Sequence, residues 1–92
     1  MTTRQEEIER ASQAQALIEA PLMVEAFATV SEALAKAWRD TTEAQERERE
    51  RLWLMLKLLS RVKAHLESVI MTGKMADRQL SEIEKRRGWK VV

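Results

Sequence analysis

The chain has 92 residues, of which 45% are apolar and 34% are charged, and it contains no Cys. The lack of Cys excludes disulfides, thiolate catalysis and Cys-based metal centres. Because two Gly and one Pro are too few for the turns of an all-β fold, the composition predicts one small all-α domain spanning residues 1–92.

A first helix is predicted over residues 1–20, beginning near Thr3. Thr3 and Glu6 have the spacing of a capping box, in which each side chain satisfies a free backbone N–H. The apolar positions that follow recur at helical spacing and form a narrow stripe of mostly small residues, Ile8, Ala11, Ala14 and Ile18. Such a stripe predicts either close packing or weak docking, and Pro21 ends the helix because the residue before Pro avoids the α region.

An antiparallel helical hairpin is predicted over residues 21–72, with a long central helix as its second arm. Pro21 suits the first turn of a helix, and a broad apolar face continues to Trp38. Polar residues 39–42 interrupt the pattern, and Thr42 with Gln45 repeats the capping spacing. The central helix is therefore expected over residues 43–72, with Trp38 and Trp53 closing the connecting end of the hairpin. The alternative for these two Trp residues is an exposed aromatic anchor for a partner.

The segment Leu52–Leu59 is apolar nearly all round, so a helix there must be covered on more than one face. One seam consists of Leu52, Leu56, Leu59, Leu66 and Ile70, and an adjacent seam consists of Met55, Leu58, Val62 and Val69. If one seam faces the same chain, the other needs a second copy. The predicted oligomer interface comprises Leu52, Trp53, Met55, Leu56, Leu58, Leu59 and Val62. The alternative is a central helix that is wrapped on all sides within one monomer.

Gly73 is a typical helix C-cap residue and predicts a break. A short basic helix and tail are then expected over residues 73–92, with Ala76, Leu80 and Ile83 facing inward and Gly88 ending the helix. The apolar tail from Trp89 is expected to dock rather than fray. A helix-turn-helix unit over residues 71–89 has the right order of elements but few supporting signals.

The net charge of +1 conceals an asymmetry between the two halves. Residues 1–50 hold six Lys or Arg and eleven Asp or Glu, whereas residues 51–92 hold ten and four. An acidic half and a basic half suit head-to-tail contacts or a basic surface that meets a polyanion. The candidate nucleic-acid contacts are Arg78, Lys85, Arg86, Arg87, Trp89 and Lys90. The alternative for these residues is an ordinary solvated helix face.

No catalytic, cofactor or metal site is predicted. His65 is the only His, and its neighbours at helical spacing include no carboxylate. Gly73 and Gly88 are isolated, so no phosphate-binding loop is expected. The N-terminus lacks the apolar core of a signal peptide, and the longest apolar run is far shorter than a membrane span. We therefore expect a non-enzymatic protein without a membrane segment.

The order of motifs resembles a group of small helical proteins of tailed phages and prophages that are encoded near head and DNA-packaging genes. The motifs that carry the resemblance lie within residues 10–80 and are Ala14-Gln15-Ala16-Leu17, Pro21-Leu22, Glu25-Ala26-Phe27, Trp38, Arg49-Glu50-Arg51-Leu52-Trp53, Leu66-Glu67-Ser68-Val69-Ile70 and Thr72-Gly73-Lys74-Met75-Ala76. The resemblance implies an oligomeric protein of particle assembly or DNA packaging, similar to a small terminase subunit. It would act in the host cytoplasm or in the virion, with phage packaging or head proteins, or DNA, as further partners.

Two other functions fit the same sequence. One is a phage-encoded inhibitor or sponge that acts on a host defence or transcription component. The other is a DNA-binding regulator that uses the basic C-terminal helix. Small terminases usually carry an N-terminal DNA-binding domain, whereas the N-terminal half of this chain is acidic. Any contact with DNA is therefore expected from the C-terminal third.

Overall fold

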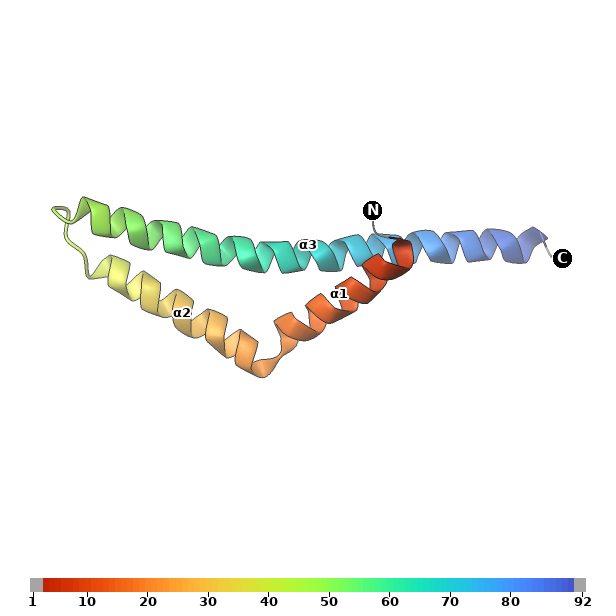
Figure 1. The fold of residues 1–92 in the computed structure, drawn as a ribbon, viewed down its shortest axis with the longest axis horizontal. Helices are drawn as coiled ribbons and strands as arrows, with labels where there is room; N and C mark the ends of the chain where they lie inside the picture. The colour runs from red at the N-terminus through yellow and green to blue at the C-terminus, as the bar shows by residue number, and fades with distance from the viewer. Residues whose placement is uncertain (1–2, 91–92) are drawn as a thin grey trace. The chain divides into compact units, whose positions relative to one another are not determined.

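The computed structural model describes the backbone of residues 3–90 and the side chains of residues 3–87. Three helices occur in this part of the chain: α1 (Arg4–Glu19), α2 (Pro21–Arg39) and α3 (Glu46–Lys90) (Figure 1). None of the described residues lies in a strand. The predicted all-α fold with a long third helix is confirmed.

The first two helix boundaries lie where the sequence predicts them. The Glu6 N–H donates to the Thr3 hydroxyl oxygen at 3.1 Å, which is the N-cap bond of α1. Pro21 occupies the first turn of α2, and Ala20 accepts the N–H groups of Met23 and Val24 at 2.9 and 3.0 Å. One extended residue therefore separates α1 from α2.

The connection between α2 and α3 is longer than predicted. α2 ends at Arg39, where Thr41 donates its hydroxyl to the Trp38 carbonyl at 2.6 Å. The Gln45 side chain accepts the Thr42 N–H at 2.9 Å, so half of the expected capping box is present. The first helical bond runs from the Arg49 N–H to the Gln45 carbonyl, however, and α3 begins at Glu46 rather than at residue 43.

The predicted break at Gly73 is wrong. α3 continues as one helix from Glu46 to Lys90, and no described residue has the positive φ that a left-handed cap needs. The separate short helix expected within residues 73–92, its end at Gly88 and the helix-turn-helix over residues 71–89 are excluded with it. The tail from Trp89 lies outside the described side chains, so its expected docking stays a prediction.

The physical reason for the continuation lies in unit 1, one of two compact units, which comprises residues 1–17 and 66–92. Gly73 is buried in α3, and a Cβ there would lie 2.9 Å from the Glu7 carbonyl oxygen and would overlap the Ala11 side chain. Gly73 is thus required for the close approach of α1, not for a turn. This packing offsets the cost of about 1 kcal/mol that Gly carries within a helix.

Small residues make the centre of the contact between α1 and α3 in this unit. Ala11, Ala14 and Ala76 are 9%, 4% and 2% exposed. Ile8, Leu80 and Ile83 are half-buried at the edges of the contact, as predicted for the inward side of each segment. The narrow apolar stripe of α1 therefore packs closely against α3.

Unit 2 comprises residues 18–65 and contains α2 and the first turns of α3, which are the predicted hairpin of residues 21–72 up to residue 65. The two arms meet at the connecting loop (Figure 1). Leu52 is 9% exposed, and the Arg49 guanidinium stacks on the Trp38 ring with 4.4 Å between Cζ and the ring centroid. Trp38 closes this end of the hairpin as predicted, but the same prediction for Trp53 is wrong because Trp53 is 50% exposed. That the two units form one domain stays a prediction.

Candidate functional site

The part of α3 that belongs to unit 2 presents large apolar side chains to solvent. We call four of these residues, which lie within about 100° of one another around the helix, the α3 apolar face: Leu54, Met55, Leu58 and Val62. Trp53 is exposed as well but lies on a neighbouring side of the helix. Leu58 is the most exposed of them at 62%, and Val62 is 54% exposed. Leu52, by contrast, is the only large apolar side chain that is buried among residues 3–87. Contiguous exposed apolar side chains mark interaction surfaces in proteins.

The predicted oligomer interface divides between two sides of α3. Leu52 is buried and Leu56 and Leu59 are half-buried, so these three belong to the hairpin core. The other four predicted residues, Trp53, Met55, Leu58 and Val62, are exposed. Arg49 stacks on Trp38 of α2, and Leu52 lies one helical turn after Arg49 on the same side of α3. The covered side of α3 is therefore the side that faces α2.

Sequence reasoning missed Leu54, which is 49% exposed. Its spacing of four residues from Leu58 places both side chains on the same side of the helix. This spacing is the sequence signal that would have assigned Leu54 to the face. Val69 was grouped with the exposed seam but is half-buried in unit 1. The α3 apolar face therefore ends near Val62.

Leu54 and Leu58 form a ridge between two shallow surface hollows. Trp53, Lys57 and Arg61 line the first hollow beside this ridge. Within it, the Lys57 ammonium lies 5.3 Å from the centroid of the Trp53 ring. The second hollow is lined on its other side by Arg47, Glu50, Arg51 and Met55. The ridge is thus flanked mainly by cations, which gives the α3 apolar face a basic rim.

The candidate nucleic-acid contacts lie at the far end of α3. Arg78, Lys85, Arg86 and Arg87 are all exposed, while the side chains of Trp89 and Lys90 lie outside the described residues. Successive helical residues point about 100° apart, so the three consecutive cations do not share one face. Arg78 and Lys85 are seven residues apart and do share one.

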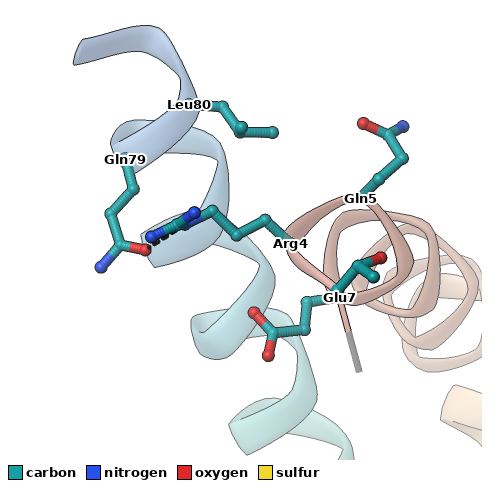
Figure 2. Close-up of a pocket in the computed structure, with 6 residues that line it drawn as sticks. Arg4, Gln5, Glu7, Gln79 and Leu80 are labelled. Atoms are coloured by element: carbon teal, nitrogen blue, oxygen red, sulfur yellow. Dashed lines mark hydrogen bonds between the residues drawn. The ribbon is translucent and has the colours of Figure 1, made fainter. Parts of the chain in front are cut away.

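A further hollow lies in unit 1 between the start of α1 and α3 (Figure 2). Arg4 crosses it and donates from Nε to Gln79 Oε1 at 2.9 Å, while Gln5 points away from α3. No buried side-chain N or O atom among the described residues lacks a hydrogen-bond partner. The hollow is therefore the edge of the contact between α1 and α3, and the hydrogen bond between Arg4 and Gln79 spans it.

The described residues contain no cluster of His, Asp or Glu that suits a metal ion. His65 is exposed. None of the helices in the described part combines the length and hydrophobicity of a membrane span. Comparison with protein-family models, curated proteins and solved structures found no match to this chain.

Proposed function

We propose that this chain is a non-enzymatic protein that works by binding copies of itself through the α3 apolar face. The observation that supports this most directly is the exposure of Leu54, Leu58 and Val62 on one side of α3, while the hairpin core buries a single large apolar side chain. Burying an exposed Leu contributes about 1.5–3 kcal/mol. Covering the exposed side chains of this face would therefore contribute free energy to binding a partner that the folded chain alone leaves unused.

The biological setting that we propose is particle assembly or DNA packaging in a tailed phage, by analogy with small terminase subunits. The resemblance of residues 10–80 to small helical phage proteins supports this setting. The hairpin of unit 2 supports it as well, since helical hairpins are suited to assembly into oligomers. Exposed Arg78 and Lys85 provide the cations that a protein of DNA packaging needs for phosphate contacts.

The first experiment measures the molar mass of the chain by light scattering across micromolar concentrations. We expect an oligomer, and we expect Leu58→Lys to weaken association by about tenfold to a hundredfold because one Leu no longer transfers out of water. Ser60→Lys is the matched control, since Ser60 is exposed on the same helix but is not part of the face. A wild-type chain that stays monomeric would exclude self-association.

The DNA component of the proposal needs a separate measurement. We expect fluorescently labelled double-stranded DNA to bind the wild-type oligomer at low salt, with an affinity that falls as salt rises. The double variant Arg78→Ala/Lys85→Ala should weaken binding, whereas Lys63→Ala, at an exposed cation in unit 2 that lines neither hollow, should leave it unchanged. If no binding occurs at low salt, the packaging role loses its DNA contact and self-association alone remains.

A further inference from the structure

The charge around the α3 apolar face limits which surface is able to cover it. The residues that line the two hollows beside it include four cations, Arg47, Arg51, Lys57 and Arg61, and one acidic residue, Glu50. Two copies that paired through this same face would bring these like charges together. Like charges across an interface oppose association, so the face favours a surface of opposite charge.

Such a surface is present on the other arm of the same hairpin. From Pro21 to Ala35, α2 contains two acidic residues, Glu25 and Glu32, and no basic residue. Lys36, which follows, forms an ion pair with Asp40 at 2.9 Å. The side of α2 that faces α3 carries Met23, Phe27 and Leu34, which are half-buried. The other side of α2 carries the exposed residues that we call the α2 outer stripe: Leu22, Ala26, Thr29 and Ala33.

The α2 outer stripe is complementary to the α3 apolar face in the size of its side chains as well as in the charge of the residues beside it. Its four positions follow helical spacing, and three of them are small, so the Leu54 and Leu58 side chains are able to approach the α2 backbone closely. Leu22 is 78% exposed, more than any other large apolar side chain among the described residues. Glu25 and Glu32 lie beside the stripe on α2. In a contact between two copies, these carboxylates would face the basic rim of the α3 apolar face.

We infer that the α3 apolar face of one copy binds the α2 outer stripe of a second copy. This inference rests on the self-association proposed above and assigns its geometry. Each copy carries one of each surface, so the contact is head-to-tail and leaves an unused surface at both ends of any pair. Such contacts continue until a ring closes or a filament forms.

Two half-blocked variants test the arrangement. Leu54→Lys/Leu58→Lys removes the ridge of the α3 apolar face, and Ala26→Lys/Thr29→Lys fills the α2 outer stripe with bulk and positive charge. Each variant alone should be monomeric. An equimolar mixture should form a 1:1 pair and nothing larger, because one intact surface remains on each protein and the two blocked surfaces repel each other.

Native mass spectrometry measures these species, and helical circular dichroism with thermal unfolding checks that both variants fold. An Ala26→Lys/Thr29→Lys variant that still oligomerises like wild type would overturn the head-to-tail contact and leave the proposed self-association intact. Two monomeric variants that do not pair on mixing would overturn it also. A monomeric wild-type chain would instead remove the proposed function on which the inference rests.

Discussion

At the scale of the residue, Gly73 controls how closely α1 packs against α3. The Glu7 carbonyl oxygen and the Ala11 side chain occupy the space that a Cβ at this position needs. Neither group is the flexible end of a long side chain. A larger residue at position 73 therefore requires the two helices to move apart.

We predict that Gly73→Ala destabilises the protein, although Ala is the better helix former by about 1 kcal/mol. Overpacking typically costs about 1–3 kcal/mol, so a lower midpoint of urea unfolding is expected. Thr72→Ala, at the exposed neighbouring position, is the control and should change the midpoint little. A Gly73→Ala protein that is more stable than wild type would contradict the close contact with Ala11.

At the scale of the element, the decisive feature is the continuity of α3 through residues 72–74. Helical bonds continue past Gly73 because the seam of Gly73, Ala76, Leu80 and Ile83 keeps one side of the helix against α1. The seam recurs at helical spacing, and a break would end this contact at Gly73.

Lys74→Pro should therefore lower the free energy of unfolding by about 3 kcal/mol or more, since Pro removes a helical N–H and clashes with the preceding turn. Lys74→Ala keeps the backbone N–H and is the matched control at this exposed position. Helix content from circular dichroism and urea unfolding measure the difference. Equal stability of the two variants would mean that a turn interrupts the helix here.

At the scale of the whole molecule, charge decides how copies meet. The cations beside the α3 apolar face and the carboxylates beside the α2 outer stripe lie on opposite arms of one hairpin. A head-to-tail contact between copies therefore joins unlike charges, whereas a contact between identical faces joins like charges.

Salt distinguishes these two modes of association. Raising NaCl from about 0.05 M to about 0.5 M shortens the screening length severalfold, so head-to-tail association should weaken and the mass at fixed concentration should fall. The Ser60→Lys protein should follow the wild type. A mass that rises with salt would indicate that screening relieves repulsion between identical faces.

The sequence by itself determined the all-α class, the ends of α1 and α2, and the inward residues of each stripe. Capping bonds, Pro geometry and helical spacing act over a few residues, so local patterns such as Thr3 with Glu6 are sufficient to predict them. Helical spacing also predicted that Leu52–Leu59 divides into two seams, because Leu52, Leu56 and Leu59 recur on one side of the helix.

Only the tertiary structure decided the roles of Gly73 and Trp53. A Gly permits a helix end and a close helix contact equally well, and which one occurs depends on whether Ala11 lies opposite it. The sequence pattern marks Trp53 only as an apolar residue. Whether its side chain is exposed depends on the side from which α2 approaches α3. These outcomes depend on residues far apart in the chain, and local spacing carries no information about them.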